Sequence, residues 1–437
     1  MINPEQILER AILSAESAEV FYIEQKDTPV RFEANQLQSI DTRELTGVAL
    51  RLIKDGRIGF CATTNLNDLD SLIDTALETA PYGAEARFEF PPMDSSPDVP
   101  VYDASSFDLP LERMVRLGQQ TVEGIRSFSD EILVGGTVSR SSQTVSLMNS
   151  KGLYKKYVKS GFSIGFEGSI VRGTDMLFVF DSMSSCRPIG DSSEVVASVI
   201  RQIEYARETA TIDTKTMPVL LLPTAVASVL LSPIMMGLNG KTVVQGTSPL
   251  VEKLGQKVMA KEFSLINDPT IPFVPGSRPN DDEGIASEKV TLIKNGVPSS
   301  FLYDLQTGGQ AGMVSTGSGE RGLGSLPTPS ASVLMVEEGT ASFDQMLTEM
   351  DDGLIVERLL GAGQGNMLGG DFSANVLLGY RVQRGQIVGR VKDTMIHGNS
   401  YRALQESIVI GGQGRWLGGG LYTPAILCSG ISVSTKE

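Results

Sequence analysis

The chain has 437 residues and a formal net charge of −15, with a sequence pI of about 4.7. An acidic chain repels phosphate groups, so these values exclude an extended nucleic-acid-binding surface. The length predicts two or three domains, and a hydrophobic content of 41% with 46 glycines indicates a globular, strand-rich protein with many turns.

The first hundred residues alternate helical and strand patterns. Asn3 followed by Pro4 predicts a helix start. Asp55-Gly56 between two β-rich runs predicts a hairpin. Repeated prolines over 81–108 indicate an irregular crossing segment. The first predicted helix starts at Pro4 and carries an apolar stripe from Ile7 to Ala15, and the second covers 66–80. The predicted strands cover 18–24, 30–34, 48–53 and 58–63.

The middle of the chain predicts two helices around a set of strands. Apolar residues recur at helical spacing over 109–127 and 192–209, and Asp191 caps the second helix. Between the helices the pattern alternates with period two. It predicts strands over 132–139, 144–149, 152–166 and 176–183, with a turn at 150–152.

One stretch of these strands matches a hydrolase motif. Residues 161–165 read GFSIG and fit GxSxG, the nucleophile elbow of α/β-hydrolases, which needs a strand, a sharp turn and a helix. Here the alternation runs straight through the motif. We therefore interpret Ser163 as a residue on the polar face of a continuous strand, with a serine hydrolase as the alternative.

The second half is organised around residues 217–240. A short apolar strand, 219–222, leads into a helix from about Thr224, whose hydroxyl is placed to cap it. We expect Pro233 to end or kink the helix, and Gly237 and Gly240 to lie at its C-cap. The helix is apolar all round, which predicts burial at the centre of a domain. Its apolar residues are Ala225, Val226, Val229, Leu230 and Leu231.

The remaining residues predict mostly strands. Residues 280–284 form a turn before a strand pair, 290–293 and 299–303, which turns at Asn295-Gly296. Lys253, Lys257 and Lys261 recur at four-residue spacing and indicate one solvated helix face. The glycine clusters at 361–370 and 411–420 carry no dinucleotide fingerprint. Further strands are predicted over 375–382, 386–391 and 421–433.

These elements predict an α+β protein. We expect N-terminal mixed α/β domains with antiparallel strands and flanking helices, followed by a β-rich C-terminal domain around a buried central helix. The expected boundaries are 1–108, 109–212 and 213–437.

The supply of metal ligands is small. A catalytic zinc site uses about three protein ligands, typically including two histidines, and the chain has one, His397. We expect His397 to be a polar residue at a turn. Asp281, Asp282 and Glu283 could instead bind Mg²⁺ or Ca²⁺. Consecutive residues of a strand face opposite sides, however, so we interpret them as a turn before a strand.

Five stretches, in chain order, resemble one protein family. They are the hairpin RLIKDGRIGFCATT at 51–64, the strand-to-helix stretch at 219–231, DDEG at 281–284, the pair GAGQ and GDFS at 361–364 and 370–373, and TPAIL at 423–427. The ordered set resembles the TldD/PmbA family, the modulators of DNA gyrase. TldD-type members carry HExxxH at the strand-to-helix junction. The matching residues here are 223–228, PTAVAS, so the chain resembles the PmbA type, also called TldE.

The resemblance implies a subunit without catalytic residues of its own. Its degenerate motif positions are Pro223, Thr224 and Ser228. It implies no cofactor in this chain and zinc in a TldD-like partner, with which it forms a heterodimer that acts on small or unfolded peptides. In isolation we expect a homodimer. The alternative is a free-standing homodimeric peptide-binding protein without enzymatic activity.

The cysteines and the apolar runs indicate the cellular compartment of the protein. Cys61, Cys186 and Cys428 are odd in number and without a spacing pattern, which is typical of free thiols in a reducing compartment. No apolar run reaches the roughly 18 residues of a membrane span, and the first residues open a helix rather than a secretory leader. We expect a cytoplasmic protein that contacts no membrane.

Overall fold

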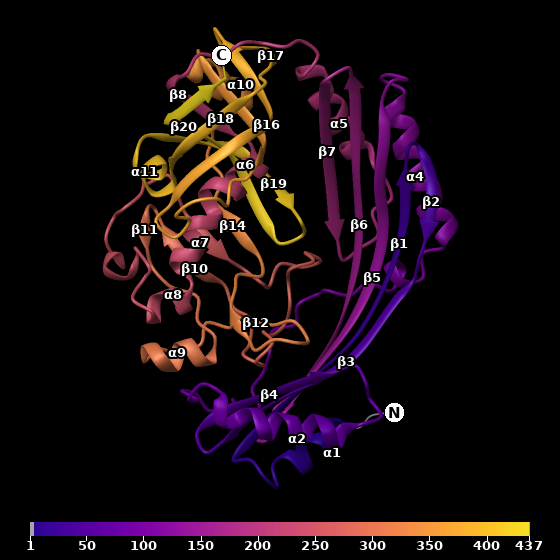
Figure 1. Ribbon diagram of the computed structural model, residues 1–437, viewed down its shortest axis with the longest axis vertical. Helices are drawn as coiled ribbons and strands as arrows, with labels where there is room; N and C mark the ends of the chain where they lie inside the picture. The colour runs from indigo at the N-terminus through magenta and orange to yellow at the C-terminus, as the bar shows by residue number, and fades with distance from the viewer. Residues whose placement is uncertain (1–3, 437) are drawn as a thin grey trace.

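The N-terminal part of the protein is an antiparallel sheet with helices packed on it (Figure 1). The computed structural model describes residues 4–436, so the predicted cap at Asn3 lies outside the described residues. The sheet order is β4-β3-β1-β5-β6-β7, with β2 paired to β1. Its strands are β1 Ser17–Glu33, β2 Gln36–Ile40, β3 Arg43–Lys54, β4 Arg57–Thr63, β5 Leu133–Asn149, β6 Tyr154–Arg172 and β7 Asp175–Ser185.

Helices pack on this sheet in two groups: α1 and α2 pack against β1 and β3, and α4 and α5 pack against β5, β6 and β7. Phe162, Ile164 and Phe166 alternate inward along β6 and pack in one core with residues of α4 and α5, while Ser163 between them is exposed. The strand interpretation of the GxSxG stretch is therefore confirmed. The N-terminal helices are α1 Pro4–Ala11, α2 Leu69–Thr79, α3 Ala104–Phe107, α4 Leu111–Arg126 and α5 Ser193–Tyr205, with a short 3-10 turn at Ala80–Tyr82.

Two predicted breaks in the sheet are wrong. The predicted strands 18–24 and 30–34 are one strand, β1, and the predicted strands 132–139 and 144–149 are one strand, β5. The two strands pair with each other from Glu19 to Phe32, across both predicted gaps. The polar residues in the two gaps are poor strand formers by local pattern. They stay in the strands because backbone hydrogen bonds between β1 and β5 continue through both gaps.

The hairpin at Asp55-Gly56 is confirmed, with positive φ at both turn residues (49° and 70°). The crossing segment 81–108 is mostly irregular, as predicted, apart from the short helix α3. Asp191 accepts a hydrogen bond from the amide of Ser193 at the start of α5, which ends earlier than predicted, at Tyr205.

The C-terminal part is built on a closed set of five strands. Strands β20, β18, β16, β15 and β8 are consecutive neighbours, and β8 also pairs with β20, which closes a barrel. Strand β19 forms a hairpin with β20. The strands are β8 Lys215–Leu221, β15 Gly353–Leu360, β16 Asp371–Gln383, β18 Thr394–Asn399, β19 Ile408–Leu417 and β20 Leu421–Thr435.

Shorter elements surround the barrel. The helices are α6 Pro223–Ala225, a π-helix Val226–Leu231, α7 Ser232–Leu238, α8 Gly240–Val244, α9 Leu305–Ala311, α10 Phe343–Met350 and α11 Ser400–Gln405, with a 3-10 turn at Val251–Lys253. The strands are β9 Leu265–Asn267, β10 Val290–Lys294, β11 Val297–Pro298, β12 Gly319–Glu320, β13 Thr328–Pro329, β14 Leu334–Val336 and β17 Gln386–Arg390.

Three predictions for this half are wrong. The segment that carries Lys253, Lys257 and Lys261 is a 3-10 turn followed by loop rather than a helix, because Gly255 has a left-handed φ of 76°. His397 lies within strand β18 rather than at a turn, because its neighbours pair with β16 and β20 on both sides. The hairpin turn at Asn295-Gly296 is confirmed. The strand predicted over 299–303 is wrong, because the strand that follows this turn is β11, Val297–Pro298.

The two parts share a hydrophobic core. Residues of α5, such as Val199, pack together with Leu220, Ile355 and Tyr380 from the barrel. A second core joins the opposite face of the barrel strands to the helix that follows β8. Strands from both sides of the expected boundary at residue 108 lie in the N-terminal sheet, and the three-domain division stays a prediction. None of the helices described over 4–436 is long and apolar enough to cross a membrane.

Candidate functional site

The strand-to-helix junction after β8 contains a π-helix. The amide of Ser232 donates to the carbonyl of Ala227, five residues back, and the widened turn covers Val226–Leu231. A π turn places residues five apart on one face. Ser228 lies within this π-helix, whereas Pro223 and Thr224 lie in α6 directly before it. Turns of this kind occur often at functional sites.

Of the two outcomes predicted for Pro233, an end or a kink of the helix, the end is wrong, because the helix continues past it. Proline lacks the N–H that would bind the carbonyl of Val229. The hydroxyl of Ser400, which is fully buried, donates to that carbonyl instead. The helix continues to Leu238, where Asn239 rather than a glycine takes the C-cap. The predicted N-cap is also wrong, because Leu222 takes that position without a side-chain cap.

The three motif positions lie on the open side of this helix. The five predicted core residues, Ala225, Val226, Val229, Leu230 and Leu231, are buried. Thr224 is exposed, and Pro223 and Ser228 are half-buried. The Ser228 hydroxyl donates to the carbonyl of Thr224 at 2.9 Å. Proline offers no donor atom, and neutral hydroxyls are not among the ligands that zinc selects. The residues present at these positions therefore do not fit a zinc ion.

The three acidic residues 281–283 form a turn, as predicted, and this turn is buried. Asp281 accepts hydrogen bonds from the amides of Glu283, Ile285 and Gly319. Gly284 has a φ of 84° and faces Leu153 so closely that a side chain would clash. Within residues 4–436, no group of three or more histidine, cysteine, aspartate or glutamate side chains is arranged to hold a metal ion.

Glu283 belongs to a buried ion-pair network that sequence reasoning missed. The guanidinium of Arg51 donates to both carboxylate oxygens of Glu19, each at 3.1 Å, and to Glu283 at 2.7 Å. Arg321 lies 2.9 Å from Glu19. All four side chains are at most 2% exposed. The network joins β1 and β3 to the DDEG turn. The sequence signal for it is a charged residue inside each of two apolar strands.

Burial changes the acidity of this network. Loss of water raises the pKa of Glu283 to about 8, against the opposing charge of Arg51, and raises the pKa of Asp281 to about 6 despite Arg278 and the three amide donors. The rings of Phe88 and Phe90 lie 4.8 and 5.1 Å from the Arg51 guanidinium. The network therefore has a structural role: it connects the N-terminal sheet to the DDEG turn of the C-terminal part.

The structure does not bring His397 and Ser163 together. The ring nitrogens of His397 each lie 2.9 Å from a serine hydroxyl, those of Ser373 and Ser434. Ser163 lies on β6 in the other sheet, opposite Ser139 and Ser184. Because both ring nitrogens already have hydroxyl partners on the barrel, this geometry gives no support to a Ser-His-acid triad.

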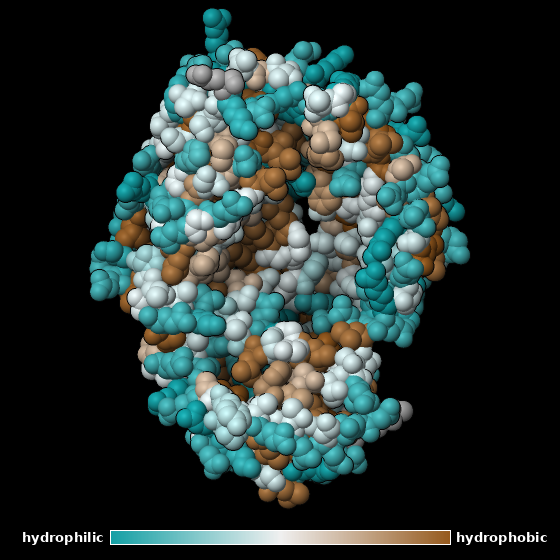
Figure 2. All heavy atoms as spheres, in the orientation of Figure 1, coloured by the Kyte–Doolittle hydropathy of each residue, from teal (hydrophilic) through white to brown (hydrophobic). Residues whose placement is uncertain are grey.

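Ser163 instead lines a cavity over the open face of the N-terminal sheet. The cavity has a volume of about 800 Å³ and includes Thr137, Glu167 and Ser182. Figure 2 shows the surface hollowed between the C-terminal part and this sheet, with hydrophobic residues on the C-terminal side. Figure 1 places α6 near the middle of the molecule beside β19.

Comparisons with known proteins agree with this architecture. The PmbA/TldA metallopeptidase C-terminal domain matches residues 214–435, and domain 1 of the same metallopeptidases matches residues 18–80. The crystal structure of TldE from Thermococcus kodakarensis covers 98% of this chain and 99% of its own, with a TM-score of 0.89 and 21% identity.

Two sequence relatives add to this. A metalloprotease PmbA homolog of Haemophilus influenzae is 22% identical over 421 residues, 92% of this chain and 89% of its own. A metalloprotease of Archaeoglobus fulgidus is 32% identical over 163 residues, 37% of this chain and 38% of its own.

The chain is thus an α+β protein of metallopeptidase architecture. It belongs to the PmbA/TldD metallopeptidase family. Its fold is that of TldE over 98% of the chain, and its sequence likeness to a PmbA homolog covers 92% of the chain.

Proposed function

We propose that this chain is a subunit without a zinc site of its own in a TldD/TldE-type metalloprotease complex. The observation that carries the proposal is the chemistry of the solvent-facing side of α6 and the π-helix. The family fold is complete around it, and Pro223, Thr224 and Ser228 offer no zinc ligands there. Zinc then belongs to a TldD-like partner, and this chain forms the other wall of a chamber that holds small or unfolded peptides.

An exposed apolar patch supports pairing with another chain. Leu133, Val171, Met176 and Phe178 are 43–57% exposed. The register places them together at one end of the open face of β5, β6 and β7, because Leu133 and Phe178 both pair with Ser169 and Val171 pairs with Met176. Exposed patches of this kind mark association sites. We propose that the patch contacts a TldD-like partner, or a second copy when the partner is missing.

Zinc analysis and peptidase assays test the proposal. The purified chain should hold no stoichiometric zinc and should leave casein and short peptides uncut, and activity should appear with a TldD-type partner. The matched control is Thr224→Ala/Ser228→Ala, which should give a complex of full activity because these side chains take no part in catalysis. One tightly held zinc per isolated chain, or peptidase activity of the isolated chain after chelation, would refute the proposal.

Light scattering tests the association. The chain has a mass of 46.9 kDa, and we expect about twice that value in isolation, since stable interfaces bury more than about 1,000 Å² and closed dimers are the commonest solution. Met176→Asp in the apolar patch should produce monomers, whereas Tyr82→Asp at an exposed site outside the patch should not. A homodimer that persists beside excess TldD-type partner would favour the free-standing peptide-binding alternative.

A further inference from the structure

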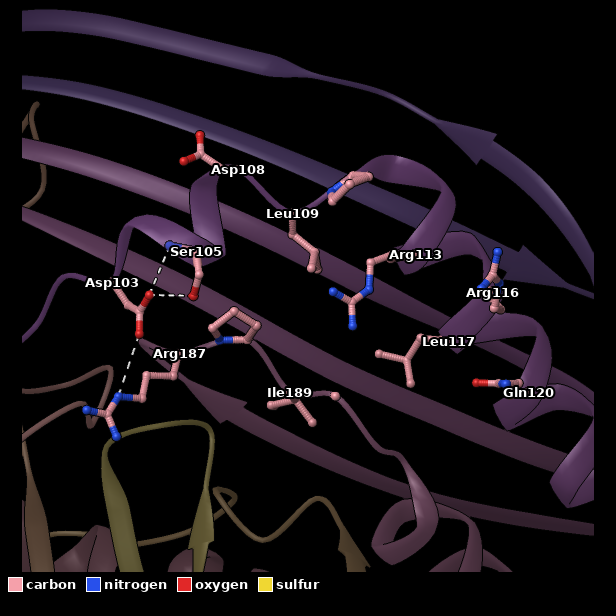
Figure 3. A pocket seen from close by; sticks show the side chains of 13 residues that line it. Asp103, Ser105, Asp108, Leu109, Arg113, Arg116, Leu117, Gln120, Arg187 and Ile189 are labelled. Carbon is pink, nitrogen blue, oxygen red and sulfur yellow. Dashed lines mark hydrogen bonds and ion pairs between the residues drawn. The ribbon is translucent and has the colours of Figure 1, made fainter.

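A second pocket lies on the helix-covered side of the N-terminal sheet, away from the open face. It has a volume of about 660 Å³ and lies between the start of α4 and residues 187–190, which join β7 to α5 (Figure 3). This volume is in the range of small-molecule sites, which are mostly apolar with a few polar groups. Leu109, Leu117 and Ile189 contribute apolar side chains to it.

The charges around the pocket are unbalanced. Asp103 is already engaged, since it accepts from the amide of Ser105 at 2.9 Å and lies 3.7 Å from Arg187. Asp108 turns away from the pocket in Figure 3. Arg113 extends into it, and within residues 4–436 Arg113 and Arg116 make neither an ion pair nor a side-chain hydrogen bond. An uncompensated cation that extends into a cavity, with a second one at its rim, is notable on a chain of net charge −15.

Hydrogen bonds hold the walls of the pocket in place. The guanidinium of Arg140 donates to the carbonyls of Phe107 and Leu109, which fixes the connection between α3 and α4. The hydroxyl of Thr121 on α4 donates to that of Ser192 at 2.7 Å, which ties the opposite wall to the same helix. The pocket is therefore formed in the absence of a ligand, and binding would require little loss of conformational entropy in its walls.

We propose that this pocket binds a small carboxylate with an apolar body. The carboxylate lies against the Arg113 guanidinium, which matches its planar geometry, with Arg116 at the rim and the Gln120 amide beside it. The apolar body packs against Leu109, Leu117 and Ile189. The positive end of the α4 dipole adds to the attraction, since Arg113 lies in the first turn of this 16-residue helix. Alkyl carboxylates and the C-terminal residue of a peptide share this chemistry.

Calorimetric titration with sodium octanoate tests the proposal on the full chain. We expect saturable binding of one octanoate per chain, and no comparable binding of 1-octanol or octylamine. N-acetyl-leucine and its amide form the second arm. Tighter binding of octanoate assigns an alkyl carboxylate, and tighter binding of N-acetyl-leucine than of either octanoate or the amide assigns a peptide C-terminus.

Arg113→Gln should weaken binding about ten- to a hundred-fold, the range expected for losing a charged hydrogen-bond partner. Arg126→Gln, at the far end of α4 and outside the pocket, is the matched control and should bind as the parent does. Both arginines are exposed, so neither change should affect folding.

A second variant keeps every charge and blocks the space. Gly190 lines the pocket, and a Cβ atom built there meets nothing within 4 Å, so a side chain can start from this position without a clash. Gly190→Trp should fold normally and abolish octanoate binding. The proposal is overturned if neither carboxylate binds saturably to the folded chain, if 1-octanol binds as tightly as octanoate, or if Arg113→Gln and Gly190→Trp both bind like the parent.

Discussion

The polar side chains at the junction after β8 lie at the surface, whereas those of the ion-pair network at the DDEG turn are buried. At the junction, the motif positions face outward, and the Ser228 hydroxyl donates to a carbonyl of its own helix. In the network, Arg51, Glu19, Glu283 and Arg321 are buried and depend on one another. The first region can therefore lose a side chain with little structural consequence, and the second cannot. Resemblance to an enzyme family thus rests here partly on residues that stabilise the fold.

The largest expected effect is loss of the Arg51 charge. Arg51→Met leaves the Glu19 carboxylate buried without its main partner and removes the donor to Glu283, and breaking a buried pair in this way costs about 3–5 kcal/mol. Chemical denaturation measures the loss. The matched control is Lys26→Met, which removes an ion pair with Glu44 on the exposed surface of the same sheet and should cost about 1 kcal/mol or less.

Adding Glu19→Gln, Glu283→Gln and Arg321→Met to Arg51→Met should recover part of that stability, because no unpaired buried charge of the network then remains. If Arg51→Met is as mild as the Lys26 control, the buried network does not stabilise the junction, and the contrast between the two regions fails.

The next largest effect concerns the carbonyl that Pro233 leaves free. Ser400→Ala removes the hydroxyl that donates to Val229, and an unsatisfied buried acceptor costs about 1–3 kcal/mol. Ser232→Ala, whose exposed hydroxyl donates to Ala227 on the same helix, is the control and should change the free energy of unfolding little. Equal effects would show that the π-helix does not need the Ser400 donor.

A third prediction concerns pH. The pKa of Glu283 is about 8 in the folded protein and about 4.3 in an unfolded chain. The folded state therefore binds more protons, and the stability that Glu283 contributes at low pH is lost as the pH rises through 8. Between pH 6.5 and 7.5 the free energy of unfolding should fall by up to about 1.4 kcal/mol on this account.

Denaturation at several pH values checks this expectation. Glu283→Gln should flatten the fall, whereas Glu320→Gln, at an exposed carboxylate, should leave it unchanged. The range ends below pH 8 because burial lowers the pKa of Lys159 to about 8, and above that pH this residue adds a change of the opposite sign. Parallel slopes for the parent and Glu283→Gln would contradict the prediction.

Local chemistry explains which features the sequence could predict. Asp55-Gly56 and Asn295-Gly296 need positive φ, and that requirement is visible in the residues themselves. The amphipathic helices α2 and α4 and the apolar stretch after β8 follow from periodicity alone. In the same way, the residue types of Pro223, Thr224 and Ser228 are enough to identify them as poor zinc ligands.

Contacts between distant segments explain the rest. Residues 25–29 and 140–143 look like interruptions, yet residues 25–28 pair with residues 140–143 in long strands. Pro233 fits inside a helix only because Ser400, 171 residues away from Val229 in the chain, supplies a donor to the Val229 carbonyl. Arg51 meets Glu283 across 232 residues. A single sequence does not reveal such partners, because the residues next to each of them in the chain are compatible with several different distant contacts.

The smallest expected effect is at the motif positions themselves. Thr224 is exposed, and the half-buried Ser228 bonds only to a carbonyl of its own helix, a contact that competes with the backbone rather than supporting it. Alanine has the better helix propensity, so Thr224→Ala/Ser228→Ala should change the free energy of unfolding by no more than about 0.5 kcal/mol. Denaturation against the parent measures this. A loss above about 2 kcal/mol would mean that the open face is a structural surface like the buried network. If stability is unchanged while the complex with a TldD-type partner loses activity, the same side chains contact the peptide, and this face is then a binding surface even without a metal.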